Sequence, residues 1–203
     1  MSKNDEIIVV IEREKLFQEI NEFQGFTADK KNVECMNRNL SRHFEEMRRG
    51  DAETNPLYKQ PIPYAIVKVG ADLFTYKRLN KGGEERLHNM ISIGLGGHMN
   101  TIEGKGWDEL LLENLQRELN EELEIKSNAE PKLTTLGFIN DDSNEVGKVH
   151  IGILIQLEYP EGAEIHVKEV DQLAGKLSSA EELKLDYDHL ENWSKIALDV
   201  ILT

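Results

Sequence analysis

Apolar runs and helically spaced apolar residues predict the elements of the N-terminal part of the chain. The run at residues 6–11 predicts a short buried strand. Residues 13–23 and roughly 31–48 predict two helices. Residues 51–63 contain three prolines and few aliphatic side chains, so they predict a linker or an ordered connecting loop. We therefore expect an N-terminal extension at residues 1–60, packed on a body at residues 61–203.

In the body, apolar runs alternate with turn signals. These runs predict strands at residues 64–69, 73–78, 90–95, 133–139, 148–159 and 164–170. The first two strands form a hairpin around Gly70-Ala71-Asp72, and a loop follows at residues 80–83. The strand at residues 148–159 alternates most regularly, with one apolar face and with Lys148 and His150 on its polar face.

Two helices complete the pattern of the body. One spans about residues 108–123, and four of its leucines face the core: Leu111, Leu112, Leu115 and Leu119. A final helix begins near Ser178 or Ser179, where Ser-x-x-Glu forms a capping box, and continues through Val200. A mixed sheet between helices accounts for this order, so we expect an α/β (α+β) fold.

The composition is that of a water-soluble globular protein, with 39% hydrophobic and 31% charged residues. The sequence has no run of eighteen apolar residues that would span a membrane, and residues 1–6 do not resemble a signal peptide. The single cysteine, Cys35, excludes an intramolecular disulfide, and a cytoplasmic protein is the simplest interpretation.

The net charge of −14 sets limits on the partners of the chain. Such a surface repels the phosphates of a nucleic-acid polymer and anionic lipid. It remains compatible with a small anionic substrate, because bound divalent cations can reverse the local sign of the charge.

The most informative segment is Arg117–Glu122. A helix here places Glu118, Glu121 and Glu122 one turn apart on one face. Like charges at this spacing cost an isolated helix roughly 0.2–0.5 kcal/mol per pair, and a cation among them offsets that cost. Clustered carboxylate oxygens suit hard cations such as Mg²⁺ or Mn²⁺. The alternative is an acidic helix face that is merely solvated and has no function. Against it, residues 108–124 contain seven acidic residues and only one basic residue, Arg117.

The segment resembles the Nudix box, Gly-x5-Glu-x7-Arg-Glu-U-x-Glu-Glu-x-Gly-U, where U is a bulky aliphatic residue. The match runs from Glu109 to Ile125 and differs at two points: eleven residues separate Gly97 from Glu109, and Glu124 replaces the last glycine. Because Glu124 replaces the glycine, helix termination must differ locally. Because of the longer spacing after Gly97, Asp108 is an alternative to Glu109 at the first glutamate position of the box. Further segments are similar to a bacterial Nudix subgroup with an N-terminal extension, namely residues 60–64, 96–100, 140–142 and 146–152.

The resemblance implies an α/β/α sandwich and a Mg²⁺- or Mn²⁺-dependent hydrolase of phosphoanhydride bonds, with a nucleoside diphosphate linked to another group as the substrate. It implies Glu118, Glu121 and Glu122 as metal ligands, one of which acts as the base, with the Gly97 carbonyl as a further ligand. It also implies that Arg117 pairs with Glu109 or its neighbour, and it places both residues in the catalytic set.

Contacts with the substrate are expected from residues near the box and on the strand that follows. Gly97 allows the backbone to approach a phosphate or a metal closely. His98, Lys148 and His150 are candidate phosphate contacts, and the alternative for each is an ordinary surface position. Asp142 and Glu145 are candidates for a further metal ligand or base, although residues 140–144 also form a normal turn sequence. Trp107 could stack on a substrate ring or anchor the start of the helix.

Two other functions compete with hydrolysis. The alternative of a different class is a non-catalytic Nudix-fold module that senses a nucleotide or a sugar nucleotide, but such modules usually lose box carboxylates that this chain retains. An isomerase of prenyl diphosphates ranks lower, because Cys35 lies outside the body. A homodimer is expected from family habit alone, and the sequence does not identify the substrate.

Overall fold

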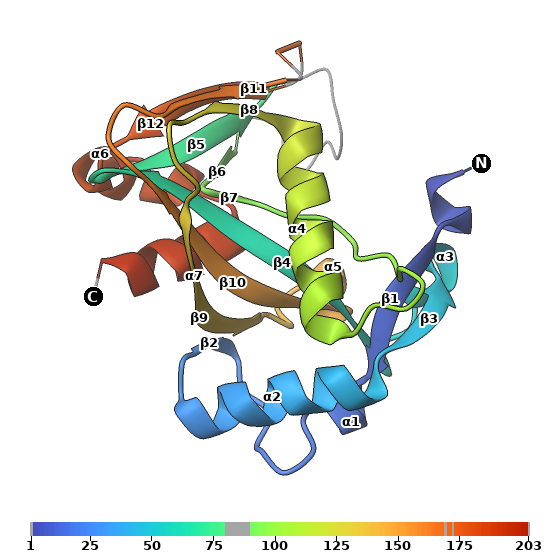
Figure 1. Cartoon of the computed structure of the whole chain (residues 1–203). Coiled ribbons are helices and arrows are strands. Elements are labelled where there is room, and N and C mark those ends of the chain that lie inside the picture. The colour runs from blue at the N-terminus through green and yellow to red at the C-terminus, as the bar shows by residue number, and fades with distance from the viewer. Residues whose placement is uncertain (1, 80–89, 169, 172, 203) are drawn as a thin grey trace. The chain divides into compact units, whose positions relative to one another are not determined.

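The computed structural model describes residues 2–79, 90–168, 170–171 and 173–202 (Figure 1). The chain forms two compact units. The first consists of Met1–Tyr64, Gly96–Gln116 and Leu136–Leu154, and the second consists of Ala65–Leu95, Arg117–Thr135 and Ile155–Thr203. The expected division into an extension at residues 1–60 and a body at residues 61–203 rests on the proline-containing segment at residues 51–63, and it stays a prediction.

The first unit contains most of the helices and strands that precede residue 65. These are η1 (Lys3–Asp5), β1 (Ile7–Glu12), α1 (Arg13–Leu16), β2 (Gly25–Thr27), α2 (Lys30–His43), β3 (Glu45–Arg48) and α3 (Arg49–Ala52). It also holds α5 (Glu145–Lys148), the starts of β4 (Tyr58–Val69), α4 (Trp107–Glu122) and β10 (His150–Tyr159), and the end of β9 (Lys132–Asn140). The strand order here is β4-β10-β9-β2, and β1 pairs with both β3 and β4.

The predicted strand at residues 6–11 is confirmed as β1, and its apolar side chains pack against α3. Ile8 and Val10 are fully buried with Ala52. The predicted helix at residues 13–23 is wrong beyond Leu16, because the side-chain amide of Asn39 donates to the carbonyls of Leu16 and Gln18. Those carbonyls therefore accept from α2 instead of from a longer first helix.

The second predicted helix of the extension is confirmed only in part. Asp29 caps the start of α2 by accepting a hydrogen bond from the Asn32 backbone. The helix ends at His43, and the chain enters β3, whose register joins Glu45–Arg48 to β1. Backbone pairing with β1 thus overrides the helical tendency of the last residues of the segment.

The predicted loop at residues 51–63 is wrong from Tyr58 onward, where β4 begins. The register between β1 and β4 covers Tyr58 and Lys59, so Pro61 and Pro63 follow the end of that ladder. A proline lacks the N–H that a ladder needs, and a strand tolerates it where no partner strand requires the bond. The two prolines therefore lie inside a buried strand.

The second unit holds further strands and the C-terminal helices. Its elements are β5 (Asp72–Arg78), β6 (Ile91–Ser92), β7 (Gly94–Leu95), β8 (Leu123–Lys126), β11 (Glu164–Val167), β12 (Leu173–Ser178), α6 (Ala180–Leu185), η3 (Tyr187–His189) and α7 (Asn192–Ile201). The order β12-β5-β4 is antiparallel, while β8 and β11 lie side by side as a separate two-stranded ladder (Figure 1).

Several predictions for the body are confirmed. The hairpin is present, with Val69 opposite Asp72, and the capping box of Ser179 and Glu182 starts α6. The final helix is divided, because α6 ends at Leu185 and α7 begins only at Asn192. The sequence pattern missed β12, and the predicted loop at residues 80–83 lies outside the described residues.

Two details of burial in the body differ from expectation. The long strand β10 begins at His150 and is buried on both faces as far as Ile155, so it has no polar face there. In α4, Leu115 is buried as expected, but Leu112 is 49% exposed, and the buried stripe contains Asn114 instead. Among the described helices, none is long and apolar enough to cross a membrane.

Gly96 is constrained by a close backbone approach. A Cβ at this position would lie 2.4 Å from the carbonyl oxygen of Pro63, whereas a Cβ at Gly106 would meet nothing within 4 Å. We expect Gly96→Ser to lower the free energy of unfolding by about 1–3 kcal/mol, because the neighbouring backbone must move. Urea unfolding measures this change, and Gly106→Ser is the matched control, expected to stay within about 0.5 kcal/mol of the parent chain.

Candidate functional site

The start of α4 is fixed by buried contacts within the first unit. Trp107 is 3% exposed, and its ring lies 6.0 Å from that of Phe44, which confirms the interpretation of Trp107 as an anchor of the helix start. Buried Asn114 accepts a hydrogen bond from the Asn100 backbone N–H at 2.9 Å and donates to the Asn100 carbonyl at 2.9 Å. The residues inserted after Gly97 are therefore tied to the helix that carries the acidic segment.

The end of α4 explains how the helix stops without the usual glycine. The helix ends at Glu122 and passes directly into β8, in which Glu124 lies opposite His166 of β11. Strand pairing takes over from the last helical turn, so position 124 does not need the left-handed conformation that favours glycine. This confirms that helix termination differs locally.

The carboxylates of the acidic segment share the last turns of α4, as the spacing predicted. Arg117 forms ion pairs with Glu118 at 2.8 Å and with Glu121 at 3.4 Å. The Glu118 side chain is 12% exposed, the Glu121 side chain is 59% exposed, and Glu122 is half-buried. The guanidinium therefore offsets repulsion within a set of oxygen donors that range from nearly buried to open.

Glu109 lies in the first turn of α4. Lys105 donates to its carboxylate at 3.2 Å, and this hydrogen bond lowers the pKa of Glu109, with the Gly106 backbone N–H contributing. Glu109 precedes Arg117 by eight residues, which is about 12 Å along a helix. The resemblance implied that Arg117 pairs with Glu109 or its neighbour, whereas the ion pairs described above join Arg117 to Glu118 and Glu121.

His98 and His150, two of the expected substrate contacts, lie together in the first unit. Their Nε2 atoms are 3.2 Å apart, and their rings meet edge to face with centroids 5.3 Å apart. Glu53 approaches His98 Nε2 to 3.5 Å, and the side-chain oxygen of Gln60 lies 2.7 Å from the same nitrogen. Sequence reasoning missed Glu53 and Gln60, because both belong to the segment interpreted as a loop.

The protonation state of His150 follows from its partners. Its Nδ1 lies 2.6 Å from the carbonyl oxygen of Val146. A carbonyl only accepts, so Nδ1 carries the proton and Nε2 presents a lone pair toward His98. Burial lowers the pKa of His150, which favours the neutral ring.

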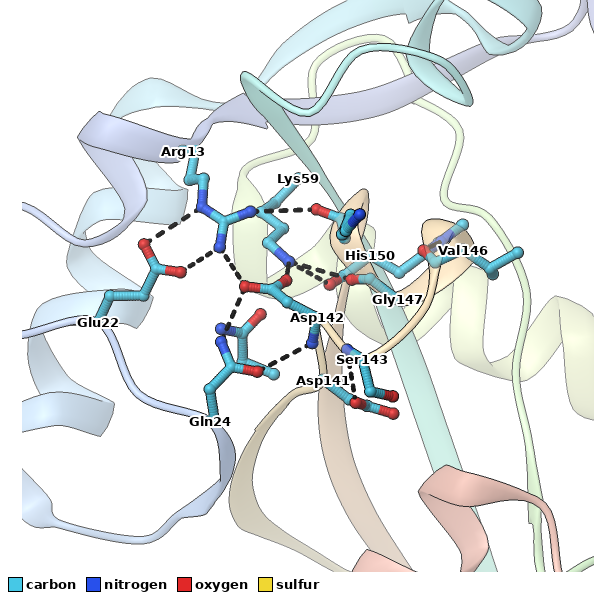
Figure 2. Close-up of polar contacts among 12 residues, drawn as sticks. Arg13, Glu22, Gln24, Lys59, Asp141, Asp142, Ser143, Val146, Gly147 and His150 are labelled. Atoms are coloured by element: carbon cyan, nitrogen blue, oxygen red, sulfur yellow. Dashed lines mark hydrogen bonds and ion pairs between the residues drawn. The ribbon is translucent and has the colours of Figure 1, made fainter.

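Lys59 and Asp142 form an ion pair in the first unit, as Figure 2 shows. The Lys59 ammonium is fully buried and donates to Asp142 at 2.7 Å and to the carbonyls of Gly147 and His150 at 3.1 Å each. Arg13 and Gln24 also donate to Asp142. Sequence reasoning missed Lys59, since a single lysine beside a proline-rich stretch carries no signal of burial.

The electrostatics of Asp142 and Lys59 reflect this burial. Burial acts to raise the pKa of Asp142, but hydrogen bonds from Lys59, Arg13 and Gln24 outweigh it and lower the pKa to about 2. Burial lowers the pKa of Lys59, and Asp142 opposes that change. Asp142 is therefore engaged by two cations, which favours a structural role over the metal-ligand or base role considered for it.

Lys148 is placed differently from the expectation. It ends the short helix α5 instead of lying on the polar face of β10, and its ammonium pairs with Glu145 at 2.5 Å. Asn144 caps α5 by accepting from the Gly147 backbone, which starts a helical turn before the strand. Lys148 and Glu145 form an exposed pair at the surface.

Comparisons with known proteins cover nearly the whole chain, although no family model matches it. Protein YmaB of Bacillus subtilis (strain 168) is 47% identical over 205 residues, which is 99% of this chain and 100% of that protein. The solved structure of Tm1382, whose assignment as a Nudix hydrolase is provisional, is 33% identical, with a TM-score of 0.81 over 97% of this chain and 98% of that one.

A more distant solved structure shares the fold alone. It is a bifunctional NMN adenylyltransferase/ADP ribose pyrophosphatase from Francisella tularensis, solved with AMP and a Mn ion. At 17% identity, its TM-score is 0.52 over 71% of this chain and 41% of that chain. The likeness to Tm1382 confirms the expected α/β arrangement of a mixed sheet with helices.

The low pKa of Asp142 predicts acid sensitivity. A carboxylate whose pKa falls from 3.8 to about 2 on folding contributes stability above pH 3.8 and loses it as the pH falls toward 2. The contribution is about 2 kcal/mol. Urea unfolding between pH 6 and pH 2 should therefore show a steeper loss of stability for the parent chain than for Asp142→Asn.

Asp142→Asn should also lower the free energy of unfolding at pH 7 by about 3–5 kcal/mol, because it removes the carboxylate partner of a buried ammonium. Glu145→Gln removes the exposed pair with Lys148 and is the control, expected to cost at most about 1 kcal/mol. Equal effects of the two substitutions would contradict the structural role of Asp142.

Proposed function

We propose that this chain, which belongs to the Nudix hydrolase superfamily, is a metal-dependent hydrolase of a phosphoanhydride bond in a nucleoside diphosphate linked to another group. One observation carries the proposal: Glu118, Glu121 and Glu122 share the last turns of α4, with Arg117 paired to two of them. A solvated acidic face does not require a nearly buried carboxylate such as Glu118, which is 12% exposed.

The donor set of this segment fits a hard divalent cation. Carboxylate oxygens are the ligands that Mg²⁺ and Mn²⁺ prefer, and Glu118, Glu121 and Glu122 would hold the ion. When bound, such an ion lowers the pKa of a water ligand and offsets the negative charge that develops on phosphoryl oxygens. The family resemblance adds the Gly97 carbonyl as a further ligand, and this stays a proposal.

The side chains of α4 divide the remaining work. One of the three carboxylates accepts the proton of the attacking water, and the exposed Glu121 is open to such a water. Arg117 is a positioning residue, because its ion pair with Glu118 restricts the rotamer of that carboxylate. Glu109 stays in the proposed catalytic set because it occupies the first glutamate position of the Nudix box.

Gly97, His98, Lys148 and His150 stay proposed substrate contacts. Of these, Lys148 is partly exposed, whereas His150 is 7% exposed. The net charge of −14 supports a small anionic substrate brought in with a cation and argues against a nucleic-acid polymer or a membrane as partner. A homodimer and a cytoplasmic location also stay proposals.

The alternative function of a prenyl diphosphate isomerase would need a catalytic cysteine, and the surroundings of Cys35 do not support that role. This cysteine is buried in α2, and Arg38 donates to its sulfur at 3.3 Å. The sensing module remains as an alternative that the following experiment separates from hydrolysis.

The proposal is tested by product release from a panel of nucleoside diphosphate derivatives with Mg²⁺, with Mn²⁺ and with chelator. We expect turnover only with metal, and we expect Glu121→Gln/Glu122→Gln to lower it at least about 100-fold, because the ion loses two oxygen donors. Glu113→Gln is the control on the same helix, since Glu113 pairs with Lys105.

Unchanged turnover in the double variant would contradict the assignment of the α4 carboxylates. Absence of turnover across the panel, together with a nucleotide that raises the melting temperature, would replace hydrolysis with the sensing function.

A further inference from the structure

We propose that His98, His150 and Glu53 form a transition-metal site for which Zn²⁺ is the fitting ion, with ligands other than the carboxylates of α4. The three side chains offer one ligand atom each, and these atoms all lie within 4.8 Å of one another. They come from three stretches of the first unit: the residues after α3, the residues after β7 and the start of β10. The inference does not rest on the proposed hydrolase activity.

Two of the three distances between the ligand atoms match those of a metal-ligand set, and the third lies within 4.8 Å. A tetrahedral Zn²⁺ with bonds of about 2.0–2.2 Å holds its ligand atoms about 3.3–3.6 Å apart. The two histidine Nε2 atoms are 3.2 Å apart, and His98 Nε2 lies 3.5 Å from Glu53 Oε1. Small movements of the side chains would therefore complete the coordination.

The orientation of His150 matches that of a ligand. Metal-binding histidines usually donate their second ring N–H to a carbonyl or carboxylate, which fixes the tautomer. The Nδ1–H of His150 donates to the carbonyl of Val146 at 2.6 Å, so its Nε2 lone pair faces the cluster. His98 can present Nε2 in the same way if its proton resides on Nδ1.

Glu53 and Gln60 complete the surroundings of the site. Arg49 donates to Glu53 at 3.4 Å and so orients the carboxylate. Gln60 is fully buried, and its oxygen lies 2.7 Å from His98 Nε2. Its amide nitrogen has no hydrogen-bond partner among the residues that the structure describes. A water in the fourth metal position would donate to the Gln60 oxygen in place of the His98 N–H.

The choice of ion follows from the donors. Two imidazoles and one carboxylate match the three protein ligands of zinc sites that keep one position open. Imidazole suits Zn²⁺, Cu²⁺, Fe²⁺ and Ni²⁺, whereas Mg²⁺ prefers oxygen donors. The two sets of side chains therefore differ in the metals that they select.

The test uses the full chain after chelator treatment and dialysis, titrated with Zn²⁺ and with Co²⁺ as a spectroscopic probe. We expect one Zn²⁺ per chain in the Glu121→Gln/Glu122→Gln variant, which lacks two α4 donors. His98→Ala in that background should weaken binding at least about 100-fold, because changes outside the ligand shell alone cost 10–100-fold. Glu53→Gln should also weaken Zn²⁺ binding. This variant tests the site if the His98→Ala variant fails to fold.

His166→Ala is the matched control, because His166 is exposed and lies 4.0 Å from a carboxylate of Glu164. X-ray absorption of the Zn²⁺-loaded parent chain should show two imidazoles at the metal. An all-oxygen shell, or Zn²⁺ binding that is unchanged by His98→Ala and Glu53→Gln, would overturn the proposal. If the parent chain binds Zn²⁺ at this site but hydrolyses none of the panel compounds, the metal site is supported and only the proposed hydrolase function is contradicted.

Discussion

The fully buried ammonium of Lys59 is the constraint on which the first unit depends. It has three acceptors, namely the Asp142 carboxylate and the carbonyls of Gly147 and His150. An uncompensated charge in this position would cost several kcal/mol, so the three acceptors must be in place when the unit folds. Arg13, which follows β1, reaches the same carboxylate (Figure 2). It also donates to the Lys148 carbonyl. The network therefore joins the first elements of the chain to the turn before β10.

This network also determines where the histidines lie. Successive side chains of a strand point to opposite faces, so Lys59 and Gln60 serve two different clusters. Lys59 holds the backbone of Gly147 and His150, while Gln60 contacts His98. The backbone of His150 is thus fixed from one face of β4, and its ring meets His98 beside Gln60. A buried ion pair with a structural role positions a cluster that has the chemistry of a metal site.

The chain contains two donor sets of different chemical hardness. The last turns of α4 offer carboxylate oxygens with a guanidinium between two of them. The cluster of the first unit offers two imidazole nitrogens and one carboxylate. Imidazole nitrogens favour borderline cations such as Zn²⁺, whereas a set of carboxylates favours hard cations such as Mg²⁺, so the two sets differ in the cation that each prefers. Because the two sets prefer different cations, metal binding at each set can be measured separately.

The sequence by itself determined β1, the hairpin of β4 and β5, the helix α4 and the capping box of α6, because these depend on local periodicity and turn chemistry. It also placed Glu118, Glu121 and Glu122 on neighbouring turns, since helical spacing is a local property. Only the tertiary structure decided that Pro61 and Pro63 lie in a strand, that α1 stops at Leu16, and that Lys59 is buried. Each of these outcomes depends on a partner distant in sequence, and the meeting of Glu53, His98 and His150 has the same origin.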